Sequence, residues 1–480
     1  MVSLAAQPPP RRPLLLSATL ALARFYYRSR GRLAYFVATT LRTPLYAVLS
    51  VIFPTWTRVI SPRPGSTVLN CVWLAQVLGV RAVYKAEIEK LDGSRGLVGG
   101  VVRVRCWTDE DGNNQEERQK GRTFVLKTSL ATTNGRLGTI VAGRVREARL
   151  YNAKEGWVPE GTRPRVWYAW ASAFFGEYVM LMEDLAGGGD ADSRAVDTNM
   201  VLGNQIWGVP AAIAARLPEW ALATADAGER DAGWLRVLTN MFEGVADMHA
   251  RWWNDPRLLL AANGFKSAEW YRGSGRIDWE LAMDVARRNW ARGKVIRAKD
   301  GKILLSPKLV AIVDRSLAHA DFAHVLAHCR STPFTLIHGD FHAANQFTVF
   351  TSSPSSSSPE ECTQRLYDWS EAGPYTPPVD LAQLLISDLP PKFTATHSRE
   401  LVRAYHARLT HQGIEYSWDE CWTAFCEGGI ERWIFVFAIM AGWPAVPGPA
   451  IAYFQNQVLA FIEAHGDREW YQLKPIVGLL

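Results

Sequence analysis

The stretch LIHGDFHAAN at 336–345 decides the interpretation of this chain, together with LYDWS at 366–370. Each stretch opens with a short apolar run and then presents acid or amide side chains. A short apolar run bounded by polar residues is the pattern of a buried strand. We therefore expect two strands that deliver polar groups to a cleft, with Asp340 and Asn345 after the first strand and Asp368 after the second.

These three side chains match the parts that phosphoryl transfer needs. A carboxylate orients the attacking hydroxyl, and an amide with a second carboxylate holds Mg²⁺, which prefers oxygen ligands and keeps waters and phosphates in its shell. The order Asp-x-x-x-x-Asn followed by a strand-borne Asp is that of protein-kinase catalytic loops. Here His-Gly-Asp stands where those enzymes carry His-Arg-Asp. The alternative interpretation is a hairpin with polar residues at its turn.

The run His-Gly-Asp-x-His-x-x-Asn resembles the aminoglycoside phosphotransferase and choline kinase superfamily, and within it the ecdysteroid kinase-like (CHK kinase-like) branch. The resemblance extends from about Leu69 to the C-terminus. It implies that Asp340 is the catalytic base and that His338 belongs to the catalytic set by shaping the loop. It also implies that ATP is the phosphoryl donor and that Asn345 and Asp368 ligate Mg²⁺.

One charge, Lys127, interrupts the apolar strand TFVLKT at 123–128. An unpaired ammonium is costly in such a strand. Pairing with the α- and β-phosphates of ATP, oriented by a glutamate on a helix, explains the lysine. Glu147 is the candidate, and Tyr151 follows it on the same helical face, as in a Glu-x-x-x-Tyr pattern of the resembled family. The alternative is an edge-strand lysine whose ammonium reaches solvent.

The segment EYVMLMEDL at 177–185 has an apolar core that runs into acidic residues and then into glycines. This is the pattern of a strand followed by a flexible connector. We predict that it ends the smaller lobe. Backbone groups from Met182 through Glu183 to Leu185 would then hydrogen-bond the adenine of ATP.

The predicted fold is α+β: a protein-kinase-like bilobal fold with a small antiparallel-sheet N-lobe, a larger helical C-lobe and an N-terminal helical extension. The predicted boundaries are 1–60 for the extension, 61–185 for the N-lobe and 186–480 for the C-lobe. Strands are expected at 82–88, 97–107, 123–128 and 177–185, and helices at 68–80, 234–253 and 309–328.

Several local signals refine the helical part. Asp380 follows two prolines, which predicts a helix N-cap, and the matching Asp of the resembled family also supports the catalytic loop. Ser417 and Glu420 predict a capping box, and Gly466 is expected to end the following helix. The basic residues between 287 and 299 are expected on a solvated helix face.

The N-terminal run LAYFVATTLRTPLYAVLSVIF at 33–53 is long enough to span a bilayer. Arg42 and Pro44 at its middle oppose spanning, since a central Arg costs ~3 kcal/mol on insertion. The arginines upstream would also place the kinase domain on the side without ATP. We predict peripheral, amphipathic attachment to a membrane through 1–60. A helix packed on the globular domain stays open as the alternative.

Composition excludes several classes of protein. The chain has 480 residues, 48% apolar and 21% charged, which is typical of a globular protein of two or three domains. Its net charge of +6 is small, and it has no basic run interleaved with aromatics, so a nucleic-acid partner is not expected. Six cysteines without CxxC pairs predict neither a zinc site nor a disulfide scaffold, and we expect a cytoplasmic protein.

In the resembled superfamily, the C-terminal helices build the pocket for the phosphate acceptor. Here those helices carry aromatic rather than acidic residues: Trp422, Phe425, Trp433, Phe435, Phe437, Trp443 and Tyr453. An aromatic pocket favours a lipophilic alcohol such as a steroid, a terpenoid or another secondary metabolite. A choline or amino-sugar kinase remains an alternative, as does a catalytically inactive binding protein of the same fold.

Overall fold

The computed structural model describes residues 69–90, 99–109, 121–129, 145–172, 177–187, 193–206, 208–300, 305–351 and 361–474. They form two compact units. The sheet unit holds the described residues up to Asp197 together with Gln346–Ser370, and the helical unit holds Thr198–Asn345 together with the chain from Glu371 onward. The chain therefore leaves the helical unit directly after Asn345 and re-enters it after Ser370.

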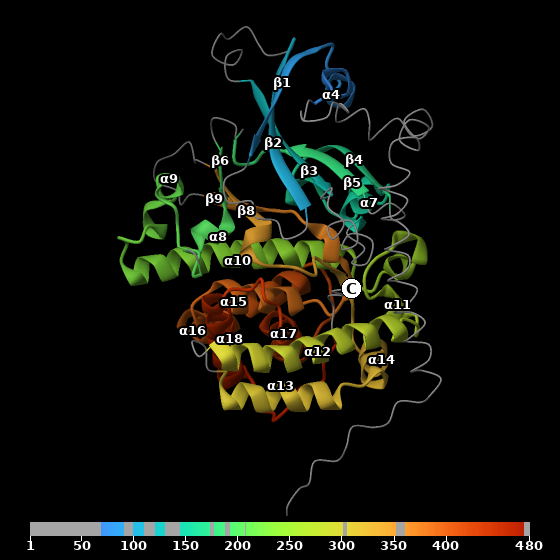
Figure 1. The fold of residues 1–480 in the computed structure, drawn as a ribbon, viewed down its shortest axis with the longest axis vertical. Coiled ribbons are helices and arrows are strands. Elements are labelled where there is room, and N and C mark those ends of the chain that lie inside the picture. The colour runs from blue at the N-terminus through green and yellow to red at the C-terminus, as the bar shows by residue number, and fades with distance from the viewer. Residues whose placement is uncertain are drawn as a thin grey trace, which may run out of the picture. The chain divides into compact units, whose positions relative to one another are not determined.

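The sheet unit is built around an antiparallel sheet (Figure 1). Within the described residues its five strands lie in the order β1-β2-β3-β5-β4. The strands are β1 (Val83–Lys90), β2 (Gly99–Thr108), β3 (Arg122–Ser129), β4 (Val166–Ser172) and β5 (Glu177–Glu183). Helix α4 (Cys71–Leu78) precedes them, and α7 (Arg146–Asn152) lies between β3 and β4 in the chain. The sequence predicts four of these strands but not β4.

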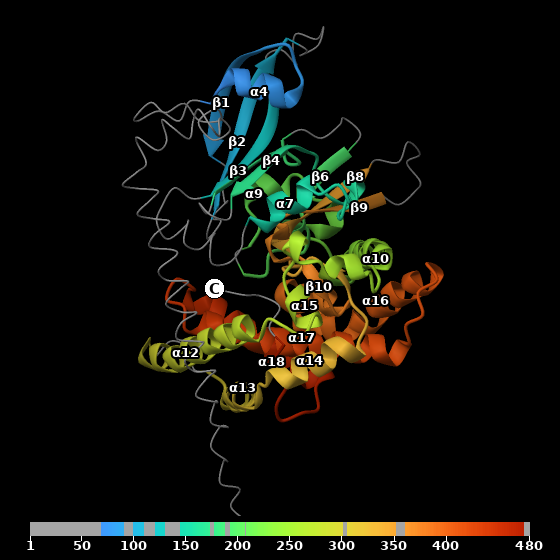
Figure 2. The same cartoon turned by 90° about the vertical axis from the view of Figure 1, so that its right-hand side faces the viewer.

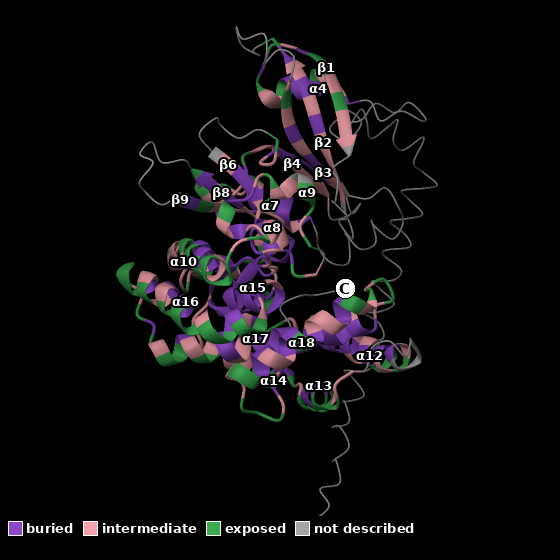
Figure 3. Cartoon of the chain, turned by 90° about the vertical axis from the view of Figure 1, so that its left-hand side faces the viewer, coloured by how far each residue is buried: buried purple, intermediate pink, exposed green. Residues whose placement is uncertain are grey.

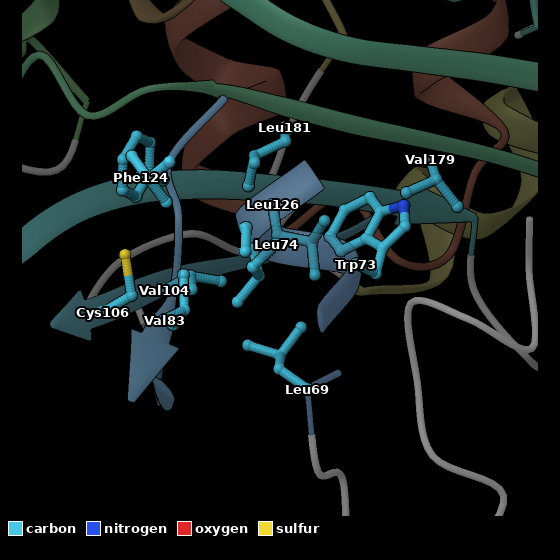
Figure 4. Close-up of a cluster of buried hydrophobic side chains, with 12 residues drawn as sticks. Leu69, Trp73, Leu74, Val83, Val104, Cys106, Phe124, Leu126, Val179 and Leu181 are labelled. Atoms are coloured by element: carbon cyan, nitrogen blue, oxygen red, sulfur yellow. The ribbon is translucent and has the colours of Figure 1, made fainter. Parts of the chain in front are cut away.

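The alternation of side chains along β5 separates the two faces of this sheet. Val179 and Leu181 pack with α4, whereas Met180 and Met182 pack on the other face with α7. Figure 4 shows the first cluster, whose labelled members are Leu69, Trp73, Leu74, Val83, Val104, Cys106, Phe124, Leu126, Val179 and Leu181. Lys127 lies opposite Met180 in the register of β3 and β5, so it shares the face on which α7 packs.

Helix α4 shows how local sequence sets an element of this unit. Its N-cap is Asn70, whose side chain accepts hydrogen bonds from the backbone N–H groups of Val72 and Trp73 at 3.0 and 3.2 Å. The helix ends at Gly79, which adopts a left-handed φ of 74° that glycine tolerates without a Cβ clash. The predicted helix at 68–80 therefore exists, with capping that shortens it at both ends.

A second antiparallel sheet completes the sheet unit. It has the order β6-β8-β9, with β6 (Ser193–Asp197), β8 (Gln346–Thr351) and β9 (Glu361–Leu366). Strands β8 and β9 run from the residue after Asn345 to just before Asp368, and Gln346 lies opposite Leu366. The short helix η6 (Trp369–Glu371) follows.

The helical unit is dominated by long helices (Figures 1 and 2). They are α10 (Ala227–Arg251), α12 (Arg276–Asp300), α13 (Pro307–His319), α14 (Phe322–Ser331), α15 (Val379–Asp388), α16 (Pro391–His411), α17 (Trp418–Ala441) and α18 (Gly448–His465). Helix α17 packs against α12, α15 and α18, and α15 is almost wholly buried (Figure 3). Strands β7 (Thr335–Ile337) and β10 (Gly373–Tyr375) pair antiparallel, and β7 leads into the loop at 338–342.

The predicted kinase-like α+β class is confirmed, because an antiparallel sheet is followed by a mostly helical part. The capping box of Ser417 and Glu420 is present, and Gly466 follows α18. The extension at 1–60 lies outside the described residues. None of the helices within the described ranges is long and apolar enough to cross a membrane.

Three predictions about the helical unit were wrong. The single helix expected at 309–328 is two helices, because Asp321 caps α14 through the N–H of Ala323. Asp380 is not an N-cap, since Pro378 holds that position in α15. The basic face of α12 is not uniformly solvated, because Arg297 is 4% exposed and donates to the carbonyl oxygens of Ala441, Trp443 and Val446.

Candidate active site

In the sheet unit, a buried lysine pairs with two carboxylates. The Lys127 ammonium lies 2.7 Å from Glu147 Oε2 and 2.9 Å from Asp368 Oδ1. The hydroxyl of Tyr151 donates to Glu147 Oε1 at 3.2 Å, one helical turn further along α7. The expected pairing of Lys127 with Glu147 is therefore present, and the edge-strand alternative for this lysine does not hold because β3 lies between β2 and β5.

The two carboxylates determine the charge state of Lys127. Burial alone lowers the pKa of its ammonium, but Asp368 and Glu147 more than reverse this and hold the pKa above its usual range. Burial raises the pKa of the Glu147 carboxyl, and the charge of Lys127 opposes that shift. The side chain of Glu147 is 1% exposed, whereas that of Asp368 is 34% exposed. Asp368 is thus the acidic member of the cluster that solvent or a ligand can reach.

The backbone places Asp368 beside this cluster. Asp368 has a φ of 62°, a left-handed conformation in which Asp and Asn are enriched among non-glycine residues. Its backbone N–H donates to Glu147 Oε1 at 2.9 Å. Glu147 therefore fixes Lys127 through one carboxylate oxygen and the backbone of Asp368 through the other.

In the helical unit, side chains of the buried helix α15 bind backbone N–H groups of the loop that carries Asp340. Asp380 accepts from the N–H groups of His338 and Gly339 at 2.6 and 3.1 Å. Gln383 accepts from Phe341 at 3.0 Å, and Asp388 accepts from Ala343 at 3.0 Å. Successive backbone donors of the loop are thereby satisfied, so the loop is held at each end and at its middle. Asp380 thus supports the loop, as the resemblance implied.

Gly339 needs to be glycine for two independent reasons. Its φ is 79°, a region that favours glycine, and a Cβ at this position would lie 2.2 Å from the carbonyl oxygen of Glu371. His338, next to it, is fully buried, and its Nδ1 accepts from the N–H of Asp340 at 3.3 Å. His338 is therefore buried within the loop, where its ring binds the backbone of Asp340, and its predicted part in the catalytic set stays a prediction.

Both oxygens of the Asp340 carboxylate are held by neighbours. Oδ1 accepts from Gln383 Nε2 at 3.1 Å, and Oδ2 accepts from Asn345 Nδ2 at 3.2 Å. His342 Nε2 lies 3.5 Å from Oδ2. The Asp340 side chain is still 37% exposed. The carboxylate is thus fixed in orientation and open to a ligand, which suits a group that must accept a hydrogen bond from a hydroxyl.

The charges around Asp340 keep it ionised. Burial alone raises its pKa, but His342, Arg432 and His338 lower it, and the pKa lies well below the usual range for an aspartate. Asp380 differs, because burial raises its pKa against the lowering effect of His338 and Arg432. Of these two carboxyls, the partly exposed one is the more acidic.

Three residues that contact the loop are not among those predicted from the sequence: Gln383, Asp388 and Arg432, which lie 43 or more residues beyond Asp340. Arg432 lies in α17, and its Nη2 donates to the carbonyl oxygen of Gly339 and lies 3.8 Å from Asp340 Oδ1. A signal for it existed, because Glu431 and Arg432 precede the apolar run WIFVF within one helix. Charged side chains in such a run indicate buried partners.

The residues predicted to bind adenine lie partly within strand β5 and partly beyond its end. Met182 lies within the ladder between Val125 and Val166, and Glu183 accepts from the N–H of Arg165 at 2.9 Å. Of the three predicted residues, only Leu185 lies beyond the strand. The connector is anchored by Asp184, which accepts two hydrogen bonds from Arg103 at 2.6 and 3.3 Å.

Asn345 in the helical unit and Asp368 in the sheet unit each carry a side-chain oxygen of the kind that Mg²⁺ prefers, and their binding of one ion stays a prediction. Asn345 uses its Nδ2 to donate to Asp340, which leaves its amide oxygen as the group a metal would use. No cluster of three or more His, Cys, Asp or Glu side chains that could hold a metal occurs within the described ranges. Few protein ligands are what Mg²⁺ needs when phosphates and waters complete its shell.

The aromatic residues expected around the acceptor fall into two groups. Phe425, Trp433, Phe435 and Phe437 are at most 4% exposed and belong to the core. Trp422, Trp443 and Tyr453 are partly exposed. Most of the aromatic content of α17 therefore serves packing, and only the second group can meet a ligand.

A Lys on β3 paired with a Glu on the following helix, an Asp-x-x-x-x-Asn loop and a later Asp define a kinase-like protein. No protein-family model matches the sequence, and no curated protein matches it. Among solved structures, the chain is similar to that of a microcompartment-associated aminopropanol kinase, with 13% identity over 83% of this chain and 99% of that chain and a TM-score of 0.36. A likeness this distant does not say what this chain binds.

Proposed function

We propose that this protein is an ATP- and Mg²⁺-dependent phosphotransferase that acts on a hydroxyl group of a small molecule. The observation that carries the proposal is the buried Lys127 ammonium, paired with Glu147 and Asp368. In kinases, the corresponding lysine binds the α- and β-phosphates and the glutamate orients it. Burying a cation with two carboxylates costs desolvation free energy, and apolar side chains of similar volume would fill the same space without that cost. A purely structural role would therefore not require these charges.

Asp340 is the residue we assign to the acceptor. Its ionised carboxylate orients the hydroxyl and accepts its proton as the hydroxyl oxygen bonds to the γ-phosphorus. The bond from that phosphorus to the bridging oxygen breaks, and ADP leaves with the electron pair. Gln383 and Asn345 hold the carboxylate in one orientation during this step.

Asn345 and Asp368 are the residues we assign to Mg²⁺, which when bound neutralises the charge that develops on the phosphates. The backbone near Leu185 is assigned to the adenine. These assignments follow the CHK kinase-like branch that the sequence resembles, to which we propose the chain belongs.

We propose a lipophilic alcohol, such as a steroid, a terpenoid or another secondary metabolite, as the acceptor. The resemblance to the ecdysteroid kinase-like branch supports it, as does the apolar run at 33–53, through which the protein would contact a membrane from the cytoplasmic side. Trp422, Trp443 and Tyr453 are the partly exposed aromatics that could meet such a ligand. Choline and amino sugars are the competing acceptors.

The test is a mass-spectrometric screen of the full chain with MgATP and a panel of lipophilic alcohols, amino alcohols and aminoglycosides. We expect a phosphorylated lipophilic product together with ADP, and no product from the Asp340→Asn variant. Phosphorylation confined to choline or amino sugars would replace the lipophilic acceptor. Binding of MgATP without transfer to any member of the panel would favour an inactive kinase-fold binding protein.

A further inference from the structure

Arg432 is a buried cation at the catalytic loop that comes from a distant part of the chain. Its side chain is 3% exposed, in the middle of α17. The charges of three carboxylates act on it: Asp340 from the loop, 3.8 Å away, Asp380 from α15 and Glu371 from the segment before β10. The hydroxyl of Tyr375 on β10 also lies near it. This single guanidinium is thus placed among three acidic groups that the fold brings together.

Fold stability gives no reason for an arginine at this position. The Nε and Nη1 atoms of Arg432 are buried and have no hydrogen-bond partner among the described residues. Unsatisfied donors on a buried charge cost free energy, and well-packed apolar residues often replace buried ion pairs without loss of stability. Only some of the N–H donors of Arg432 are satisfied. The effect of its charge and of its hydrogen bond to a backbone carbonyl on the neighbouring residues therefore explains this arginine better than stability does.

Those neighbours are the two residues at the tip of the loop. The N–H of Gly339 is held by Asp380, and its carbonyl oxygen is held by Arg432 Nη2. The two peptide groups that flank the Gly339 Cα are therefore each held by a buried side chain. The same Nη2 lies 3.8 Å from Asp340 Oδ1, the oxygen that also accepts from Gln383.

We propose that Arg432 is a positioning residue for phosphoryl transfer, which holds the Gly339 carbonyl and the Asp340 carboxylate so that the carboxylate faces the acceptor hydroxyl. This inference rests on the proposed function, in which Asp340 receives the hydroxyl proton. Arg432 itself touches neither nucleotide nor acceptor, because its side chain is buried. Its loss should therefore lower kcat and leave nucleotide affinity unchanged.

Two substitutions of Arg432 and one matched control test this inference. Arg432→Met removes the charge and the backbone bond, and we expect kcat to fall by about 10²-fold with the KM for ATP unchanged, as misplacement of a reacting group does. Arg432→Lys keeps the charge without the planar fork and should recover about tenfold of that loss. The control is Arg297→Met, which removes another buried arginine that bonds backbone carbonyls of the helical unit and should leave kcat within about twofold.

Hydrogen exchange of the loop amides at 336–345 gives a readout that does not depend on turnover. We expect faster exchange in Arg432→Met, intermediate exchange in Arg432→Lys and no change in Arg297→Met. If the wild type transfers no phosphoryl group to any acceptor, the proposed function fails, and exchange alone decides whether Arg432 holds the loop. Wild-type exchange in both Arg432 variants would overturn the inference, as would a kcat for Arg432→Lys equal to that of Arg432→Met in a folded, active enzyme. If Arg432→Met does not fold, the Arg432→Lys variant carries both measurements.

Discussion

The sheet unit and the helical unit each hold one charged side chain in place, and they do so by different interactions. In the sheet unit, Lys127 is matched by side chains of opposite charge, with Glu147 and Asp368 within 3 Å. In the helical unit, Asp340 is placed by a loop whose backbone donors are bound by the buried helix α15. One group depends on direct charge pairing, and the other depends on the shape of its loop.

This difference predicts different consequences of substitution. A direct ion pair fails when either partner is removed, because the remaining buried charge is left uncompensated. A group held through its backbone tolerates loss of its own charge without unfolding, since the bonds from α15 remain. We therefore expect substitutions at Lys127 to affect both stability and activity, and substitutions at Asp340 to affect activity alone.

The largest expected effect is that of Asp340→Asn. The amide keeps the shape of the side chain but cannot accept the hydroxyl proton, so kcat should fall by about 10²- to 10⁴-fold. The backbone bonds of Asp380 and Gln383 do not depend on that charge, and the melting temperature should stay near that of the wild type. Steady-state kinetics with an accepted alcohol and a thermal melt check both parts. Undiminished turnover would remove Asp340 as the base.

Lys127→Met tests the other half of the comparison. It leaves Glu147 buried without its cation, and breaking a buried pair in this way costs about 3–5 kcal/mol of unfolding free energy. The double variant Lys127→Met/Glu147→Gln removes the orphaned charge and should recover most of the stability but no activity. Denaturant unfolding and ATP turnover of both variants are the measurements. Equal stability of the single and double variants would show that direct charge pairing does not hold this cluster.

Asp368→Asn should affect nucleotide binding more than folding. Its carboxylate is partly exposed, and its charge serves the metal in the proposed function. Wild-type protein at a MgATP concentration of 100 Kd gains about 2.7 kcal/mol of stability. The variant should lose most of this gain. Glu87→Ala, which removes an exposed carboxylate of β1, is the control and should keep it. A full MgATP-induced gain in the Asp368 variant would exclude this carboxylate as a ligand.

The smallest expected effect concerns pH: the stability contributed by the Lys127 charge should not change between pH 6 and pH 9. The pKa of Lys127 is held above its usual value of about 10.4, so its stabilising charge is fully present below that value and is lost only as the pH rises through the folded pKa. The stability deficit of the double variant Lys127→Met/Glu147→Gln, which has no orphaned Glu147 carboxyl to titrate, should therefore change by less than about 0.5 kcal/mol between pH 6 and pH 9. Unfolding curves at both values check this. A deficit that shrinks toward pH 9 would mean that burial outweighs the two carboxylates.

The pairing of Lys127 with Glu147 in the sheet unit could be predicted because both residues carry local signals, whereas the contact of Lys127 with Asp368 could not. Lys127 interrupts an apolar strand, and Glu147 and Tyr151 share a helical face. Strand β4 gave no such signal. Its sequence VWYAWAS is apolar except for the final serine, so it lacks the alternation of apolar and polar residues by which a half-buried strand is recognised.

The supports of the catalytic loop could not be predicted in the same way. Asp380, Gln383 and Asp388 bind backbone N–H groups. Almost every residue has a backbone N–H, so the sequence does not show which residue such a side chain binds. Arg432 lies on another helix and binds a carbonyl oxygen and a carboxylate that only the tertiary fold brings near. The motif therefore indicates Asp340 as the proposed base, whereas the orientation of its carboxylate depends on contacts distant in sequence.

The most direct test of the central claim is to follow the γ-phosphate itself. A ³¹P NMR spectrum of the full-length protein with MgATP and an accepted alcohol should show loss of the γ-phosphate signal matched by gain of a phosphomonoester signal. The Asp340→Asn sample should show bound ATP and no change over the same period. A wild-type spectrum with bound ATP and no phosphomonoester, or with inorganic phosphate as the only product, would contradict phosphoryl transfer to a small-molecule hydroxyl.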